Sequence, residues 1–258
     1  RRPPSFTPFP YTPLFRSRAG HDINYLARAG VAACSGRKET GPCLCGVQIA
    51  DVASGSNHAV IGILAAVVHR HRTGEGQYVD VSMTDGAVAF NALFAAAYLV
   101  DGSENCCGEG VLNGGSLYDF YETQDGKYLS FGGLEPQFFS AFCEAIGRPD
   151  LIPGGVIPAD LPRVKEEVGR VLKTRTRDEW AAVFAKVDAC VEPVLSLGEV
   201  LGDDQVRARG MVVEVDLPGG GKVKQPGHPI RYSATPPQYG PAGCAAGVHT
   251  REVLLGLG

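Results

Sequence analysis

The sequence predicts a mixed α/β fold, and three observations lead to this prediction. Helical apolar patterns cover residues 58–72 and 87–99, with a β-branched, strand-like stretch at 77–83 between them. A stretch with several glycines follows at 101–117. After it, 118–122 and 128–131 resemble a pair of strands that runs directly into a helix. Strands and helices that follow one another in this way favour the α/β class, and the glycine-rich stretch favours a domain boundary.

We therefore expect five segments along the chain. Residues 1–17 contain several prolines and no periodicity, so we expect them to be disordered and non-native in origin. Residues 18–100 form a first domain, and 101–117 form a linker. Residues 118–230 form a second, α+β domain, and 231–258 form the last segment.

The expected elements of the first part begin with a short helix at 24–33. Asp51 follows, near the entrance of the helix at 58–72, after the small polar residues 53–57. Backbone N–H groups at such an entrance can hold a negative oxygen. The stretch 77–83 is predicted to be a strand. The nearly all-apolar helix at 87–99 must be buried in this fold or against a partner subunit.

The second part has clearer local signals. Pro136 suits the first turn of a helix that places Glu135 at the N-cap, and Gly147 ends that helix. Capping boxes begin at Thr176 and Ser196. The stretches 211–217 and 222–224 flank a glycine-rich turn and predict a hairpin.

Charge and apolar patterning exclude several classes of protein. The net charge is −4, and no run of Lys and Arg is long enough to follow a phosphate backbone, so we expect no nucleic-acid partner. The longest apolar runs, 59–68 and 87–100, are shorter than the roughly 18 residues of a membrane span, so we expect no membrane partner. The N-terminus has no apolar signal region. These features predict a cytoplasmic protein.

The eight cysteines are irregularly spaced, which predicts reduced thiols, mostly in the core, rather than a disulfide framework. Three pairs could supply metal ligands: Cys43 with Cys45, Cys106 with Cys107, and His69 with His71. No second pair at metal-site spacing accompanies any of them. We predict no metal site.

Three residues are the candidates for acid–base chemistry. His21 can take a proton near neutral pH, and a carboxylic acid such as Asp51 or Glu135 can return one when its surroundings keep it protonated. Each residue also has a purely structural interpretation: His21 as a helix start, Asp51 as a cap, and Glu135 as a favourable charge at a helix N-terminus.

Four ordered motifs add a family resemblance. They are "GHDINY" at 20–25, Asp51 after its small-residue run, "DVSMTDG" at 80–86 and "GGLEPQFF" at 132–139. Over about residues 19–258 the chain resembles the α-methylacyl-CoA racemases, a branch of the family III CoA-transferase (CaiB/BaiF-like) superfamily. The resemblance implies the α/β fold of family III, in which residues 18–100 are the remnant of an incomplete Rossmann-like, CoA-binding large domain and 118–230 are the smaller α+β domain. It also implies that residues 231–258 return toward the large domain and that the protein forms an interlocked homodimer.

The resemblance also implies roles for the candidate residues. His21 and Asp51 would exchange protons with C2 of a 2-methylacyl-CoA thioester, and Glu135 of the partner subunit would orient His21. The segment that would line the thioester and pantetheine comprises Gly20, His21, Asp22, Ile23, Asn24 and Tyr25. Asp22 would orient His21 or cap the helix. No separate cofactor is implied, because CoA is part of the substrate.

Two alternatives stay open at this point. In a family III CoA-transferase, the residue that matches Asp51 attacks the thioester and forms a mixed anhydride. Members of the family also begin with about a hundred residues before "GHDINY" that this chain lacks, and they continue beyond it with a C-terminal helix. The second alternative is therefore an inactive, truncated fragment.

Overall fold

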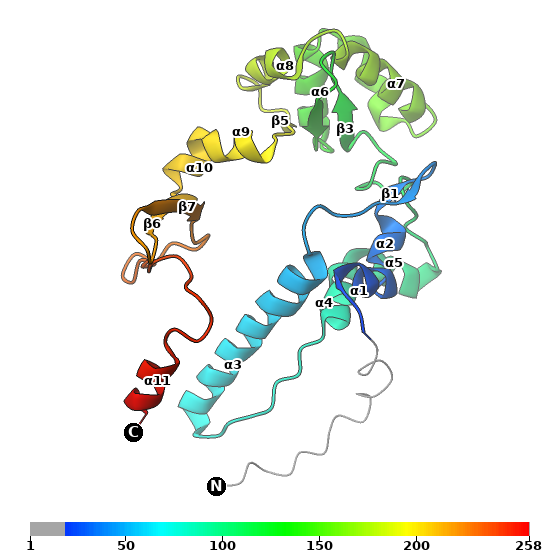
Figure 1. The fold of residues 1–258 in the computed structure, drawn as a ribbon. Coiled ribbons are helices and arrows are strands. Elements are labelled where there is room, and N and C mark those ends of the chain that lie inside the picture. Colours follow the sequence, from blue (N-terminus) through cyan, green and yellow to red (C-terminus); the bar gives the residue numbers. More distant parts are fainter. Residues whose placement is uncertain (1–18, 258) are drawn as a thin grey trace. The chain divides into compact units, whose positions relative to one another are not determined.

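The computed structural model describes residues 19–257 and divides the chain into two compact units, one ending at Pro193 and the other beginning at Val194 (Figure 1). The segment 1–17, predicted to be disordered, lies outside the described residues. The predicted small domain, 118–230, extends across the division at 193–194, so its boundaries stay a prediction.

The first unit begins with helices and one short hairpin. Its elements are α1 (Asp22–Arg28), α2 (Val31–Cys34), β1 (Gly36–Arg37), β2 (Gly41–Pro42), the π-helix η1 (Ile49–Asn57), α3 (His58–Thr73), α4 (Met83–Phe90) and α5 (Ala92–Asp101). The predicted helix at 24–33 is thus two helices. It breaks because Gly30 adopts the left-handed region at φ 79°.

Two further predictions for this part are wrong. Residues 53–57 are helical, because η1 leads directly into α3 and the continuous helix begins at Ile49. Residues 77–82 form no strand (Figure 1). The Ser82 hydroxyl accepts the N–H of Asp85 at 3.2 Å and starts α4, and no strand of residues 19–257 pairs with this stretch.

The apolar stretch predicted as one helix at 87–99 bends by 71° at Asn91 into α4 and α5. The Asn91 side chain donates a 3.0 Å hydrogen bond to the carbonyl of Ala29, which fixes the bend against the end of α1. Among residues 19–257 nothing covers this surface: Leu93 is 66% exposed and Leu99 is 83% exposed. The predicted burial in this fold is therefore not met, and burial against a partner subunit stays a prediction.

The continuous helix Ile49–Thr73 is 25 residues long, and its most apolar stretch has a mean hydropathy of 1.4. It is long and apolar enough to cross a membrane, which differs from the expectation because the helix starts earlier than the apolar run. Among the described residues there is one such helix, or two if the bent pair of α4 and α5 is counted as one span. An interior helix of a water-soluble protein meets the same criteria, so the absence of a membrane partner stays a prediction.

The rest of the first unit packs helices against a small sheet. Its elements are β3 (Asp119–Glu122), β4 (Tyr128–Phe131), α6 (Pro136–Ala145), two 3₁₀ turns (Pro149–Leu151 and Pro153–Val156), α7 (Leu161–Leu172), α8 (Arg177–Phe184) and β5 (Val191–Pro193). The sheet is antiparallel in the order β3-β4-β5, with Phe120 opposite Ser130. The predicted hairpin and the helix after Pro136 are confirmed.

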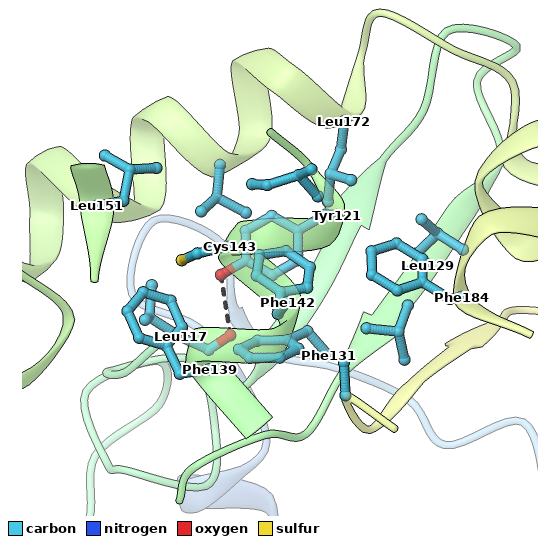
Figure 2. Close-up of a cluster of buried hydrophobic side chains, with 14 of the residues drawn as sticks. Leu117, Tyr121, Leu129, Phe131, Phe139, Phe142, Cys143, Leu151, Leu172 and Phe184 are labelled. Atoms are coloured by element: carbon cyan, nitrogen blue, oxygen red, sulfur yellow. Dashed lines mark hydrogen bonds between the residues drawn. The ribbon is translucent and has the colours of Figure 1, made fainter. Parts of the chain in front are cut away.

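Aromatic rings fill the core between the sheet and these helices (Figure 2). Phe142 is fully buried, and its ring centroid lies 4.3 Å from that of Phe131 and 5.5 Å from that of Phe184. The Tyr121 hydroxyl donates a 2.9 Å hydrogen bond to the carbonyl of Leu117, so its polar end is satisfied inside the core.

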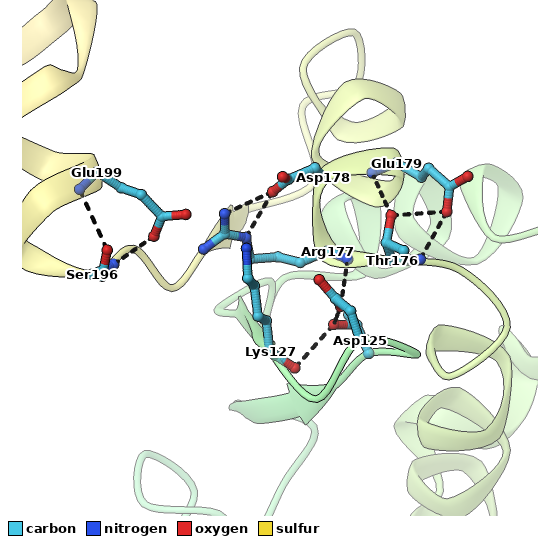
Figure 3. Close-up of polar contacts among 9 residues, drawn as sticks. Asp125, Lys127, Thr176, Arg177, Asp178, Glu179, Ser196 and Glu199 are labelled. Carbon is cyan, nitrogen blue, oxygen red and sulfur yellow. Dashed lines mark hydrogen bonds and ion pairs between the residues drawn. The ribbon is translucent and has the colours of Figure 1, made fainter.

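Both predicted capping boxes form (Figure 3). The Thr176 hydroxyl accepts the N–H of Glu179, and a Glu179 carboxylate oxygen accepts the N–H of Thr176 at 2.8 Å. Ser196 and Glu199 repeat the arrangement in the second unit. Each box satisfies N–H groups that a helix start would otherwise leave without partners.

The second unit contains α9 (Leu197–Gly202), α10 (Asp204–Ala208), β6 (Val212–Asp216), β7 (Lys222–Pro226) and α11 (Thr250–Gly256). The antiparallel pair β6–β7 confirms the predicted hairpin. Its turn uses Gly220 and Gly221 at φ 94° and 86°, a backbone region that other residues rarely adopt.

Candidate active site

The hexapeptide 20–25 forms the start of α1, with His21 as the N-cap residue. The N–H of His21 donates a 3.0 Å hydrogen bond to Asn24 Oδ1, and the Tyr25 hydroxyl donates one of 3.2 Å to the carbonyl of Gly20. The polar groups of Asn24 and Tyr25 thus hold the segment together. The side chains of His21 and Ile23 are exposed, so these two are accessible to a ligand.

The Asp22 carboxylate reaches across to the helix that carries Asp51. Its Oδ1 accepts the N–H of Ala50 at 2.6 Å and the N–H of Asp51 at 3.1 Å. These amides lie in the first turn of η1, where no partner exists within the helix and where the helix dipole favours a negative charge. Of the two predicted roles of Asp22, orienting His21 or capping a helix, the hydrogen bonds show capping. The capped helix is η1, however, and not α1.

Asp51 is partly buried in the first turn of η1, and its carbonyl accepts a 2.9 Å hydrogen bond from the Ser56 hydroxyl. The prediction that N–H groups at this helix entrance can hold a negative oxygen is confirmed, and for two of them that oxygen belongs to the Asp22 carboxylate. The amides of Ala50 and Asp51 are already bound by the Asp22 carboxylate.

Close packing supports this arrangement of α1, η1 and α4. Four buried residues form its core: Leu26, Ala29, Ala50 and Ala87. The buried Ser54 donates a 2.5 Å hydrogen bond to the carbonyl of Met83 on α4. A Cβ at Gly86 would lie 2.2 Å from Ser54 Oγ, so only glycine permits this approach of η1 and α4.

Glu135 occupies the predicted N-cap position of α6, where its carbonyl accepts the N–H groups of Phe138 and Phe139 at 3.1 Å each. Its side chain is exposed, makes no cap hydrogen bond and, within residues 19–257, has no ion-pair partner. The side chain of Asp22, next to His21, therefore contacts the backbone of Asp51, and among the described residues no hydrogen bond joins Glu135 to His21 or Asp51. Its contribution to a partner subunit's site stays a prediction.

A cavity of about 440 Å³ lies between the β1–β2 hairpin and the strands β3 and β4. Its apolar wall includes Tyr118, Phe120 and Phe131, and Gly132 borders it just before the loop that carries Glu135. No motif in the sequence pointed to this cavity. Its walls come from segments about 80 residues apart, and no local pattern signals such a meeting.

An ion cluster around the buried carboxylate of Asp119 borders the cavity. Asp119 is bound by Arg37, whose Nη1 donates to Oδ2 at 2.9 Å, and by Lys165, whose Nζ lies 2.5 Å from the same oxygen. Burial alone would raise the pKa of Asp119. The hydrogen bonds from Arg37 and Lys165 outweigh that effect and hold the pKa below its usual value.

All eight cysteines are free thiols, but only Cys143 is buried, so the prediction of mostly core thiols is wrong. Burial raises the pKa of Cys143 to about 12, which keeps this thiol protonated. Within the part of the chain that the structure describes, no group of three or more His, Cys, Asp and Glu side chains is arranged to hold a metal ion.

Comparison with known proteins identifies the family. The sequence matches the family model of CoA-transferase family III over residues 10–250. The chain belongs to this family. Among solved structures, a CaiB/BaiF family protein from Brucella suis has a TM-score of 0.76 at 23% identity, over 93% of this chain and 64% of that one. This likeness confirms the predicted family III fold.

Curated family III relatives include proteins with different reactions. The chain is 34% identical to human alpha-methylacyl-CoA racemase over 76% of this chain and 52% of the relative. It is 30% identical to mouse succinyl-CoA:glutarate CoA-transferase over 97% of this chain and 58% of the relative. The chain thus spans about half the length of the curated relatives it matches.

Proposed function

We propose that this chain carries the acid–base pair of a racemase that inverts C2 of 2-methylacyl-CoA thioesters. One observation chiefly supports the proposal. The Asp22 carboxylate binds the N–H groups of Ala50 and Asp51, so the segment that carries the exposed His21 lies against the start of the helix that carries Asp51. A two-base 1,1-proton transfer needs an acid and a base that reach opposite faces of one carbon, and two adjacent helix starts can supply such a pair.

In the proposed reaction, His21 or Asp51 removes the C2 proton from one face of the thioester, and the electron pair moves into the carbonyl to give an enolate. The other residue then delivers a proton to the opposite face, which restores the thioester with inverted C2. The two residues exchange roles according to the epimer bound. A positioned base contributes about 10²–10⁴-fold, and hydrogen-bond donors at the enolate oxygen contribute about 10²–10³-fold each.

The other predicted residues have supporting roles in this proposal. The segment Gly20–Tyr25 lines the thioester and pantetheine, with the exposed Ile23 as one apolar contact. Glu135 of a partner subunit orients His21, which makes the enzyme a homodimer. CoA enters as part of the substrate, and the reaction needs no further cofactor.

The second candidate is a CoA-transferase reaction, and one observation favours it. The similarity to the mouse transferase extends over 97% of this chain, whereas the similarity to the human racemase covers 76%. In this reaction the Asp51 carboxylate attacks the thioester carbon and expels the CoA thiolate, leaving a mixed anhydride. The thiolate attacks the Asp51 carbonyl, which releases the first carboxylate and leaves CoA as a thioester on Asp51. A second carboxylate attacks this thioester and expels the thiolate, which then attacks the acyl carbonyl of the new anhydride and gives the second acyl-CoA and free Asp51. His21 has no required role in it.

The deciding experiment incubates the chain, restored to the length of its relatives, with one epimer of a 2-methylacyl-CoA in deuterated water. We expect the product to carry deuterium at C2, measured by mass spectrometry, and to lose optical purity, measured by chiral analysis. Robust transfer of CoA between two carboxylates, without C2 exchange, would instead establish the transferase.

Single substitutions sharpen this test. His21→Ala and Asp51→Asn should each abolish epimerisation, because each removes the only proton donor or acceptor on one face. Either variant can still exchange the C2 proton of one epimer. Glu135→Gln should lower the rate less than either. In a transferase, Asp51→Asn alone would abolish turnover, and robust epimerisation by that variant would refute the racemase proposal.

A further inference from the structure

We propose that Asp22 is a positioning residue: through its hydrogen bonds to the N–H groups of Ala50 and Asp51, it sets the spacing between His21 and Asp51. The proposal rests on the proposed function, since it concerns the same pair of residues. It adds a third carboxylate to the site, one that acts on the geometry of the pair and not on the substrate.

The hydrogen bonds carry this inference. One carboxylate oxygen, Asp22 Oδ1, accepts two consecutive amides, at 2.6 Å from Ala50 and 3.1 Å from Asp51. A charged acceptor makes stronger hydrogen bonds than a neutral one, and two donors fix its position better than one. Asp22 directly follows His21, and one of the two donors belongs to Asp51 itself. The hydrogen bonds of Asp22 are therefore only a few covalent bonds away from both His21 and Asp51, the two residues proposed to transfer protons.

The surrounding packing does not fix this spacing alone. The core between α1, η1 and α4 contains alanine methyl groups at Ala29, Ala50 and Ala87 and the side chain of Leu26. Ser54 and Gly86 hold η1 against α4, but the apolar contacts that this core makes with α1 are non-directional. The hydrogen bonds of Asp22 are directional and specify how the start of α1 lies against the first turn of η1. An error of about 1 Å in the position of a reacting group can cost on the order of 10²-fold in rate.

The competing explanation is that Asp22 itself exchanges protons or interacts with the substrate through its charge. Its Oδ1 faces the two amides, but the carboxylate also has Oδ2. The two explanations differ in what they require of the residue. Positioning needs a hydrogen-bond acceptor at Oδ1, which asparagine also provides, whereas a direct role needs the ionisable carboxyl group.

The first measurement uses the 258-residue chain and needs no catalytic activity. Hydrogen exchange at the amides of Ala50 and Asp51 is compared in the parent, Asp22→Ala and Asp22→Asn. We expect these amides to exchange at least fivefold faster in Asp22→Ala and to stay within threefold of the parent in Asp22→Asn. Asp80→Ala is the matched control, since Asp80 is an exposed aspartate with no hydrogen bond to η1. Parental exchange rates in Asp22→Ala would overturn the proposal.

The second measurement is kinetic and uses the protein at the length of its relatives. Asp22→Ala should lower kcat for C2 epimerisation by 10- to 100-fold and change KM by less than threefold, and Asp22→Asn should recover kcat to within tenfold of the parent. Equal losses in both variants would assign Asp22 a direct, charge-dependent role and overturn positioning. If the parent protein does not epimerise the substrate at all, the proposed function fails, whereas the exchange data still decide whether Asp22 holds η1.

Discussion

Removing the Asp119 carboxylate should destabilise the first unit, and the structure allows the size of the effect to be worked out. Asp119 begins β3, and its side chain is 7% exposed. Its carboxylate accepts hydrogen bonds from both terminal nitrogens of Arg37 in β1 and forms an ion pair with Lys165 in α7. Lys165 also donates to the carbonyl of Gly114 in the glycine-rich stretch. One carboxylate therefore joins segments from three parts of the unit.

The magnitude follows from what Asp119→Ala breaks and what it leaves behind. A hydrogen bond to a charged group contributes about 1.5–3 kcal/mol, and removing one partner of a fully buried ion pair costs about 3–5 kcal/mol. The cations left behind are partly accessible, since the side chain of Arg37 is 42% exposed and that of Lys165 is 30% exposed. Water can solvate them, so we expect a loss of about 2–3 kcal/mol in the free energy of unfolding.

The assay is urea denaturation, monitored by the fluorescence of Trp180. This residue is the only tryptophan of the chain, and it is 2% exposed in the core between the sheet β3-β4-β5 and the helices. Asp150→Ala is the matched control, because Asp150 pairs with Arg148 at the surface and its side chain is 61% exposed. Exposed pairs contribute little to stability, so this control should unfold like the parent. A loss of less than 0.5 kcal/mol in Asp119→Ala, on the order of an ordinary surface change, would refute the reasoning.

The stabilisation by Asp119 should also depend on pH. The folded state holds the pKa of Asp119 below its usual value, so the unfolded state binds a proton more readily. The stabilisation is complete above the unfolded pKa of about 3.9 and is lost as the pH falls through the lower, folded pKa. The difference in stability between the parent and Asp119→Ala should therefore shrink as the pH falls below about 4.

Three further substitutions, with Phe120→Ala as the control for the first, test the packing and the caps. Phe142→Ala should cost about 3–5 kcal/mol in urea denaturation because the ring is fully buried, whereas Phe120→Ala, at a 59% exposed site, should cost far less; equal losses would contradict the packing. Gly20→Ala should disturb the start of α1, because its Cβ would lie 3.1 Å from the ring of Tyr25. We expect faster hydrogen exchange at the amides of α1, and exchange at the parental rate would contradict this prediction. Thr176→Ala should lower stability by about 1 kcal/mol through loss of the N-cap, with an unchanged urea midpoint as the contrary result.

Local signals in the sequence were sufficient for much of the second half of the first unit. Pro136 and Gly147 mark the two ends of α6, and Thr176 marks the start of α8. Such residues act through backbone groups within a few positions, so the pattern and the structure report the same interactions. The hairpins β3–β4 and β6–β7 were predictable for the same reason, whereas the short β1–β2 hairpin was not predicted.

Predictions that depend on distant partners fared less well. Residues 77–82 have strand-forming side chains, but a strand also needs a neighbour, and none is present among the described residues. The contact of Asp22 with Ala50 joins positions 28 residues apart, so no local pattern indicates which helix the carboxylate caps. Sequence could therefore place His21 and Asp51 on helix starts, whereas the structure was needed to show what joins them.

The π-helical geometry of η1 has a consequence for insertions and deletions. In a π-helix each N–H bonds to the carbonyl five positions back, whereas in an α-helix it bonds to the carbonyl four positions back. Each hydrogen-bonded loop of the segment Ile49–Asn57 therefore contains one residue more than a loop of α3, which follows it. Deleting one residue from this segment would let the α-helical ladder of α3 continue backward. The positions before the deletion would then turn by roughly 100° about the axis. Asp51 would face another side of the helix, and Asp22 would meet a different pair of amides. The length of this segment, and not only the identity of its residues, is therefore part of the site.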